Sequence, residues 1–273
     1  MRVERHETEA ADWEIARRDP PPALRPLLLG GVEGWAQTRG DAPELREVPF
    51  PGIPLILNLG PPWQVDGIRH LHSFTAGMGT ASSTVRGEAT WTCIELRLTP
   101  QGAHRLFGVS MHELANRAVE LNDLLPETRD VEARLREARG WSDRFDLVDA
   151  FLLHRLKDSR PADPGVAWSW HHLYAAQGRA PIGALASELG WSHRRLIARF
   201  REQIGLTPKA VARVIRFDRA ATALRMQDRG LAEIAYACGY ADQAHLNREF
   251  RELAGTSPSR FRASIAGSGA ISA

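Results

Sequence analysis

Arginine and amide side chains recur along two C-terminal segments at the spacing of one helix face. Because a helix turns by about 100° per residue, residues three and four apart share a face. The first face holds Arg194, Arg195, Ala198 and Arg201. The second holds Ala244, His245, Arg248 and Arg251, flanked by Gln243 and Asn247. Arginine can donate two hydrogen bonds to guanine, and Gln or Asn can pair with adenine. The chemistry indicated is hydrogen bonding to base edges.

Each of these faces belongs to the second of two short helices. In the first pair, Gly190 permits a left-handed turn and Ser192 is placed to cap the second helix. Asp242 is the corresponding cap in the second pair. The stripes expected to be buried comprise Leu196, Phe200 and Ile204 in one helix and Leu246, Phe250 and Leu253 in the other. This layout predicts two helix-turn-helix units.

The two units are copies of one sequence pattern. Leu185-Ala186 and Gly190 align with Ile234-Ala235 and Gly239. After one inserted residue, six of thirteen positions are identical: Leu196, Phe200, Arg201, Glu202, Gly205 and Pro208 match Leu246, Phe250, Arg251, Glu252, Gly255 and Pro258. A solvated face of a small helical domain would also carry charge. Duplication of an arginine-bearing second helix instead favours two recognition helices that enter DNA major grooves.

A continuous helix is predicted between the copies, over Pro208 to Gln227. The segment starts with proline and carries apolar residues at helical spacing. Twenty residues span about 30 Å, close to the separation of roughly 34 Å between successive major grooves. Such a helix would fix the register of the two units on DNA. Its basic residues, which could reach phosphates, are Lys209, Arg213, Arg216 and Arg219.

These residues resemble the AraC/XylS family of transcription regulators over roughly residues 165–262. The resemblance is carried by LASELGWSHRRLIARFREQIGLTPKAVARVIRFDRAATAL and by IAYACGYADQAHLNREFRELAGTSPSRFR. It implies two helix-turn-helix units on one connecting helix, which bind adjacent major grooves on one face of DNA. The chain departs from the family pattern at Val211, where an aromatic residue is frequent, and at Ala244 and Leu246.

The resemblance also implies which side chains contact DNA. The base-contacting set is Arg194, Arg195, Ile197 and Ala198 in the first unit and Gln243, Ala244, His245, Asn247 and Arg248 in the second. Ile197 and Ala198 can make only apolar contacts, so base reading by the first unit falls to Arg194 and Arg195. The phosphate-contacting set is Ser192, Arg201, Lys209, Arg213, Arg216 and Arg251.

Charge is divided unevenly along the 273 residues. Residues 181–262 contain 14 Lys and Arg against 8 Asp and Glu, a net charge of +6 in a chain whose total is +2. A basic C-terminal part suits a polyanionic partner, here double-stranded DNA. The start of the chain lacks the apolar stretch of a secretory signal, and no apolar run approaches a bilayer span. We therefore expect a cytoplasmic protein that does not enter membranes.

Catalytic and metal-binding motifs are missing from the sequence. There is no G-x-S-x-G, phosphate loop or G-x-G-x-x-G pattern. Cys93 lies in the apolar segment WTCIEL, so both it and the distant Cys238 are expected to be buried thiols. His70 and His72 alternate on one strand face, but no third metal ligand follows them. The sequence predicts no enzyme, cofactor or metal site.

The N-terminal part reads as strands followed by helices. Short apolar runs alternate with Gly and Pro between Trp13 and Leu98, and a helix is predicted over Trp141 to Leu156. The fold class expected is α+β, with an all-α C-terminal domain. Domain boundaries are placed at 1–160 for a β-rich sensor or dimerisation domain, 165–263 for the double helix-turn-helix domain and 264–273 for a flexible tail.

The N-terminal domain leaves the mode of regulation open. Trp13, Trp35, Trp63 and Trp91 could line an apolar ligand pocket, although core packing is favoured for each of them, and no ligand-binding residue is assigned. The expected function is a sequence-specific DNA-binding transcription regulator modulated by a small molecule. A homodimer is an expected partner, as is RNA polymerase for an activator. The alternatives are a ligand-binding or enzymatic protein with an idle helical appendage, and a regulator controlled by a protein partner or by redox chemistry.

Overall fold

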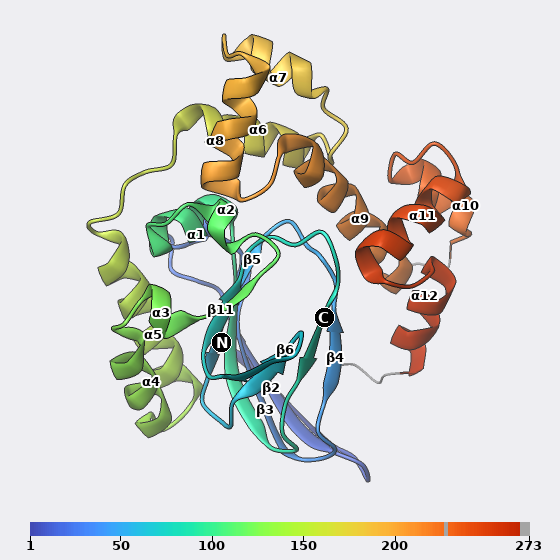
Figure 1. Ribbon diagram of the computed structural model, residues 1–273. Helices are drawn as coiled ribbons and strands as arrows, with labels where there is room; N and C mark the ends of the chain where they lie inside the picture. Colours follow the sequence, from blue (N-terminus) through green and yellow to red (C-terminus); the bar gives the residue numbers. More distant parts are fainter. Residues whose placement is uncertain (227–228, 268–273) are drawn as a thin grey trace.

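The computed structural model describes residues 1–226 and 229–267 as a β-rich N-terminal part followed by helices (Figure 1). This confirms the α+β fold class. The strands are β1 (Arg2–Glu7), β2 (Asp12–Arg18), β3 (Leu28–Arg39), β4 (Glu44–Glu47), β5 (Ile53–Asn58), β6 (Trp63–Val65), β7 (Ile68–Leu71), β8 (Phe74–Ala76), β9 (Ser83–Arg86), β10 (Trp91–Leu98) and β11 (Ala118–Glu120). The sequence analysis did not predict β1, which pairs with β2, or β11.

The strands form two antiparallel sheets that pack face to face. The larger sheet has the order β1-β2-β3-β10-β5-β8-β11, and the smaller has the order β4-β9-β6-β7. Both faces of the larger sheet are buried, as consecutive residues of β10 show. Ile94 packs with the helices, whereas Cys93 packs with residues of the smaller sheet. The space between the sheets is therefore an apolar interior.

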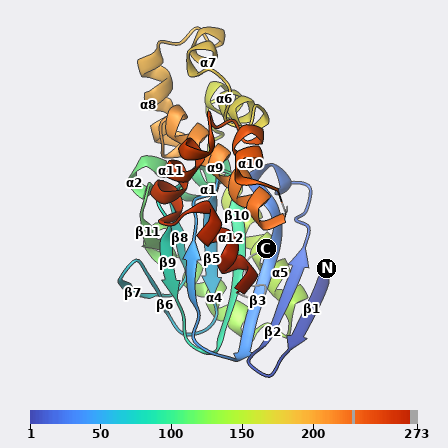
Figure 2. The same cartoon turned by 90° about the vertical axis from the view of Figure 1, so that its right-hand side faces the viewer.

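Helices cover the outer face of the larger sheet and continue into the C-terminal part (Figure 2). The N-terminal helices are α1 (Pro100–Phe107), α2 (Met111–Leu114), α3 (Leu121–Leu124), α4 (Thr128–Glu137) and α5 (Trp141–Leu156), with a short 3-10 helix at Arg25–Leu27. Helix α5 has the bounds predicted for it. Its Trp141 packs on Gly34 of β3 and donates a hydrogen bond of 2.6 Å from Nε1 to Glu14 Oε1. This contact attaches α5 to the sheet.

The C-terminal helices form two groups at the ends of one long helix. They are α6 (Pro164–Ala175), α7 (Ile182–Glu188), α8 (His193–Ile204), α9 (Pro208–Met226), α10 (Leu231–Ala237), α11 (Gln243–Ala254) and α12 (Pro258–Gly267). Helix α6 begins at Pro164, one residue before the predicted start of the C-terminal domain. Helix α12 includes the first residues of the predicted tail. Residues 268–273 and Gln227, the predicted end of the connecting helix, lie outside the described residues.

One hydrophobic core crosses from the N-terminal part into the first helix-turn-helix unit. Met111 and Leu114 of α2 share a cluster with Ile204 and Leu206 at the end of α8. Gly205 lies so close that a Cβ atom there would come within 3.0 Å of the carbonyl oxygen of Met111. The second unit has a separate core built around Phe217 and Phe250. The first unit is therefore fixed to the N-terminal part by apolar packing.

The close contact of α5 with the sheet predicts the cost of one added methyl group. A Cβ at Gly34 would lie 2.3 Å from two ring carbons of Trp141, whose indole is buried. Gly34→Ala should lower the free energy of unfolding by about 1–3 kcal/mol, measured by urea unfolding. Gly183→Ala is the control, because that glycine is exposed on α7 with no neighbouring atom within 4 Å. An unchanged stability of the Gly34 variant would contradict this packing.

Candidate nucleic-acid interface

The first helix-turn-helix unit consists of α7 and α8. Gly190 makes the turn between them with a φ of 62°, in the left-handed region that favours glycine. Ser192 caps α8 by accepting a hydrogen bond of 3.2 Å from the amide of Arg195. Leu196, Phe200 and Ile204 are fully buried, as predicted. The opposite face of α8 is therefore directed to solvent.

The second unit repeats this geometry with α10 and α11. Gly239 makes the turn with a φ of 81°, and Asp242 caps α11 by accepting a hydrogen bond of 2.7 Å from the amide of His245. Leu246 and Phe250 are buried against Phe217 of α9, with the rings of Phe217 and Phe250 4.7 Å apart. Both recognition helices are thus anchored by apolar contacts on the face opposite their exposed residues.

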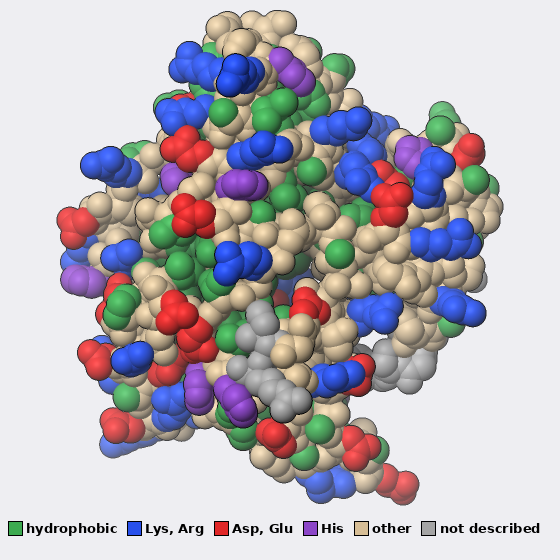
Figure 3. All heavy atoms as spheres, viewed as in Figure 1, with side chains coloured by type: hydrophobic (Ala, Val, Ile, Leu, Met, Phe, Trp, Pro, Cys, Tyr) green, Lys and Arg blue, Asp and Glu red, His purple; other side chains and the backbone are tan. Residues whose placement is uncertain are grey.

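Most of the predicted base-contacting residues lie on open helix faces. Exposed members of that set are Arg194, Arg195, Ala198, Gln243, Ala244 and Arg248, whereas Ile197, His245 and Asn247 are half-buried. Among the predicted phosphate contacts, Ser192, Arg201, Lys209 and Arg251 are exposed. Figure 3 shows Lys and Arg side chains over the helical upper and right-hand parts of the molecule. These positions are compatible with the predicted contacts, which remain predictions.

Two predicted phosphate contacts are engaged inside the domain. The Nε atom of Arg213 lies 2.8 Å from Oε1 of Glu249, and a second ion pair joins Arg213 to Glu252. Arg216 lies 3.8 Å from Glu249 and donates a hydrogen bond of 3.0 Å to the carbonyl oxygen of Gly178. Glu249 is 5% exposed, so these guanidinium groups compensate a buried carboxylate. They connect α9 to α11 and to the turn that follows α6.

The sequence analysis did not identify Glu249, which also contacts a predicted base-contacting residue. Nε2 of His245 lies 3.8 Å from Glu249, one helical turn further along α11. The ring of Tyr240 packs edge-on against that of His245, and burial raises the pKa of the Tyr240 hydroxyl. The spacing of four between His245 and Glu249 was a visible signal for this contact. The side chain of His245 is therefore held on two sides.

Four tryptophans that the sequence analysis singled out gather between the two sheets. Trp35, Trp63 and Trp91 are buried in one cluster, and Trp13 packs against it. The rings of Trp63 and Trp91 meet edge to face at 5.3 Å. Within the described part of the chain, the indole N–H groups of Trp35, Trp63 and Trp91 have no hydrogen-bond acceptor. Each unpaired buried donor costs about 1–3 kcal/mol.

Strand β4 contacts both this cluster and the second unit. Leu45 packs against the tryptophan cluster, while Arg46 points to the other side and donates a hydrogen bond of 3.3 Å to the carbonyl oxygen of Ala254, the last residue of α11. Val48, just beyond the strand, packs against the core of the second unit. The smaller sheet therefore connects the tryptophan cluster to one recognition helix.

Charged groups line the contact between β10 and α9. Arg97 donates a hydrogen bond of 3.0 Å to Glu95 of the same strand, and both Arg97 and Arg225 interact electrostatically with Asp218 of α9. Burial raises the pKa of the Asp218 carboxyl to about 6, although the two guanidinium groups act in the opposite direction. The charged form of Asp218 is thus disfavoured in the folded chain.

Other predicted features of the chain are placed as follows. Cys93 and Cys238 are buried, and burial raises the pKa of both thiols. His70 and His72 are exposed, and within residues 1–226 and 229–267 no three His, Cys, Asp or Glu side chains come together as a metal site requires. None of the helices in these ranges is long and apolar enough to span a bilayer.

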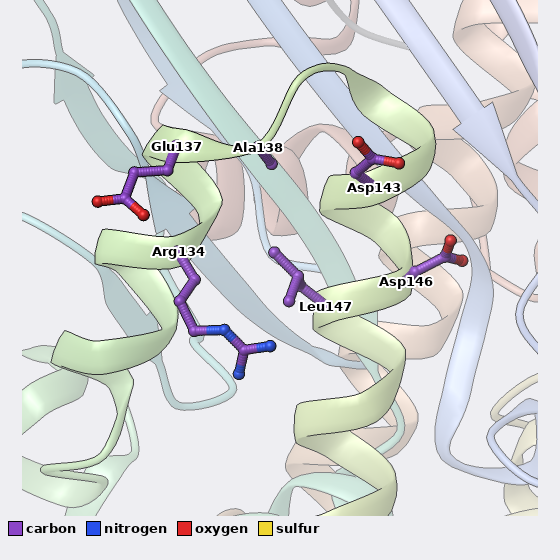
Figure 4. A pocket seen from close by; sticks show the side chains of 6 residues that line it. All are labelled: Arg134, Glu137, Ala138, Asp143, Asp146 and Leu147. Atoms are coloured by element: carbon purple, nitrogen blue, oxygen red, sulfur yellow. The ribbon is translucent and has the colours of Figure 1, made fainter.

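A surface groove of about 460 Å³ lies away from the recognition helices (Figure 4). Arg134 and Glu137 of α4 line one side, and Asp143, Asp146 and Leu147 of α5 line the other. Asp146 is also paired with Arg18 of β2. Most of its lining residues carry a charge and the groove is open to solvent, so it does not enclose a ligand as a small-molecule site does.

Sequence comparison finds similarity in the C-terminal helices to a known family. Residues 185–264 match the family described as a helix-turn-helix domain. The chain is 32% identical over 145 residues to the transcriptional activator RhaS of Escherichia fergusonii. The matched region covers 53% of this chain and 41% of RhaS. It is 28% identical over 86 residues to the probable transcriptional regulator LumQ of Photobacterium leiognathi, covering 32% of this chain and 35% of LumQ. The matches span less than half the length of either relative.

Two solved structures were also compared with the chain. ToxT from Vibrio cholerae O395, bound to (E)-4-(8-methylnaphthalen-1-yl)but-3-enoic acid, is similar with a TM-score of 0.49 and 12% identity, over 86% of this chain and 98% of ToxT. The DNA-binding domain of AdpA, in complex with a target DNA, is similar with a TM-score of 0.36 and 24% identity, over 38% of this chain and 96% of that domain.

The environment of Asp218 predicts a pH dependence of stability. Because its pKa is raised in the folded chain, folding takes up a proton, and stability falls as the pH rises toward about 6. Asp218→Asn removes this penalty and should raise the free energy of unfolding by about 1–2 kcal/mol near pH 7.5, with roughly a third of that gain near pH 4.5, where the folded carboxyl is still protonated but the unfolded one is already mostly ionised. Urea unfolding at both pH values measures the difference. Asp158→Asn, at an exposed carboxylate, is the control, and an equal gain at both pH values would refute the prediction.

Proposed function

Because residues 185–264 form a helix-turn-helix domain of the AraC type, we propose that the chain is a sequence-specific DNA-binding transcription regulator. The observation that carries the proposal is the pair of capped, exposed, arginine-bearing helices at the two ends of α9. Helix α9 has 19 residues and a length of about 28 Å, so the helices that it connects are separated on the scale of one DNA turn. Binding of chromosomal DNA would place this activity in the cytoplasm.

The two units would divide the work of recognition. In the second, Gln243, Asn247 and Arg248 offer hydrogen bonds to bases, and Ala244 and His245 complete the face. In the first, Arg194 and Arg195 supply the polar contacts beside Ile197 and Ala198. Phosphate contacts would come from Ser192, Arg201, Lys209 and Arg251. Arg213 and Arg216 would reach phosphate only by sharing the guanidinium groups that now pair with Glu249.

The tryptophan cluster supports modulation by a small molecule that binds between the sheets. Three buried indole N–H groups in one apolar cluster offer donors to a ligand with oxygen acceptors and an apolar body. Strand β4 would transmit its binding, because Leu45 contacts the cluster and Arg46 contacts the end of α11. The buried thiols with raised pKa values give redox control less support. The name of RhaS as an activator favours contact with RNA polymerase, and a homodimer is retained as a further partner.

DNA selection from a random library with the full chain tests the main proposal. The selected site should show base preferences, and the logarithm of affinity should fall with the logarithm of salt concentration by about 0.9 for each neutralised phosphate. Arg248→Ala should lower affinity by about 1–3 kcal/mol and relax one base pair, whereas Lys209→Ala should weaken all sequences alike. Arg139→Ala, on the N-terminal part, is the charge-matched control. Selection of no sequence, or binding that ignores salt, would refute the proposal.

A thermal-shift screen with intrinsic fluorescence tests the effector. Small carboxylic acids, lactones and sugars are suitable probes, because each pairs oxygen acceptors with an apolar surface. A ligand should raise the melting temperature, shift tryptophan emission and bind more weakly to Trp35→Phe, which removes one donor. Its effect on DNA affinity should shrink in Arg46→Ala. A ligand whose binding leaves tryptophan emission and DNA affinity unchanged would argue against this site.

A further inference from the structure

Trp191 occupies the turn between α7 and α8 and has a different contact on each side of its ring. Toward the interior, the ring packs on Gly165 of α6, where an added Cβ would lie 2.6 Å from Cζ2 and 2.8 Å from Cη2. Toward solvent, the Cζ atom of Arg195 lies 4.5 Å from the ring centroid. This distance is within the range of a cation–π contact. The ring therefore lies between a helix of the scaffold and an exposed arginine.

The backbone fixes both partners of this contact. The amide of Trp191 donates a hydrogen bond of 2.9 Å to the carbonyl oxygen of Ala186 in α7. The amide of Arg195 is held by the Ser192 cap, at the first turn of α8. Glycine at position 165 leaves room for the indole, which α6 would otherwise displace. The backbones of Trp191 and Arg195 are thus fixed at the junction of α7 and α8, and the indole lies against α6.

Arg195 differs from the next arginine on α8 in how its charge is compensated. Arg199 forms ion pairs with Glu202 at 2.7 Å and with Asp163 at 3.3 Å. In the part of the chain that the structure describes, Arg195 has no carboxylate partner, and its guanidinium lies against the indole face of Trp191. An exposed guanidinium held by an aromatic ring keeps all its N–H donors for another acceptor. The guanidinium of Arg199 is instead engaged in ion pairs within the domain.

We propose that Trp191 is a positioning residue for DNA recognition, which holds the Arg195 guanidinium ready for its contact with DNA. This inference rests on the proposed function. An arginine that is already ordered loses less side-chain freedom on binding, so part of the cost of forming the contact is removed. The resulting gain in affinity should be about two- to fivefold, as for a cation–π contact at an exposed site. Gly165 supports it by leaving the ring in place.

A double-mutant cycle with the full chain tests this role on the DNA site selected for the wild type. Trp191→Leu should weaken DNA binding about two- to fivefold. Arg195→Ala alone should weaken DNA binding by a larger factor. In the Arg195→Ala background, Trp191→Leu should have no additional effect. In an Arg194→Ala background, which keeps the stacked arginine, Trp191→Leu should retain its full effect. The second cycle is the matched control.

Base preference and an aromatic variant distinguish positioning from general support of the fold. Trp191→Leu should relax the same base pair, or change the salt slope in the same way, as Arg195→Ala does. Trp191→Phe should restore most of the affinity, because it keeps an aromatic face for the Arg195 guanidinium. If Trp191→Leu melts too early to be used, the same cycle with Trp191→Phe should show a smaller coupling of the same sign. The inference is overturned if the losses of affinity at positions 191 and 195 are additive in the cycle that can be measured, whether with Trp191→Leu or with Trp191→Phe.

The experiments distinguish a failure of this positioning role from a failure of the proposed function. If the wild-type chain selects no DNA sequence, the proposed function fails. If it binds a defined site and the losses at positions 191 and 195 are additive, only the positioning role fails. Equal loss of affinity on every site in Trp191→Leu, with the salt slope and the base preference of the wild type, would likewise show a structural role alone.

Discussion

The apolar contact between α2 and the end of α8 determines how the helical part sits on the rest of the chain. Ile204 and Leu206 enter the core that also contains Met111 and Leu114, and Gly205 lies directly against the backbone of α2. Since α9 starts immediately afterwards and is continuous, its direction follows from this contact. The second unit is then carried to the neighbourhood of β4. A few buried side chains thus orient both recognition helices.

Basic residues of the C-terminal part fall into two groups with different physical roles. Arg199, Arg213 and Arg216 pair with carboxylates, and the partner of Arg213 is almost fully buried. Removing one member of a buried pair leaves an uncompensated charge, so such residues are needed for the fold. Arg194, Arg195 and Arg248 are exposed on the open faces of α8 and α11. The excess positive charge is therefore larger on those faces than the bare count of residues suggests.

The helix-turn-helix units could be predicted from sequence because their signals are local. Ser192, Asp242, Gly190 and Gly239 act within one or two turns of the chain, and periodicity alone separated the buried from the exposed faces of α8 and α11. The role of Glu249 as the partner of two arginines could not be predicted in this way, because both arginines lie on α9, more than thirty residues away. The same holds for the sharing of one core between α2 and α8, which depends on tertiary packing. Strand β1 was missed because its sequence is polar and mostly exposed.

Strand β4 lies at the edge of the smaller sheet and contacts α11, the recognition helix of the second unit. The first unit is joined to the N-terminal part by a buried core, whereas the second is joined through Arg46, Val48 and the close approach of Ser82 to Gly255. A change within the sheets would therefore reach the two units unequally. Under the proposed function, regulation would alter the length of DNA that the chain protects, with the first half-site occupied in either state and the second occupied in one.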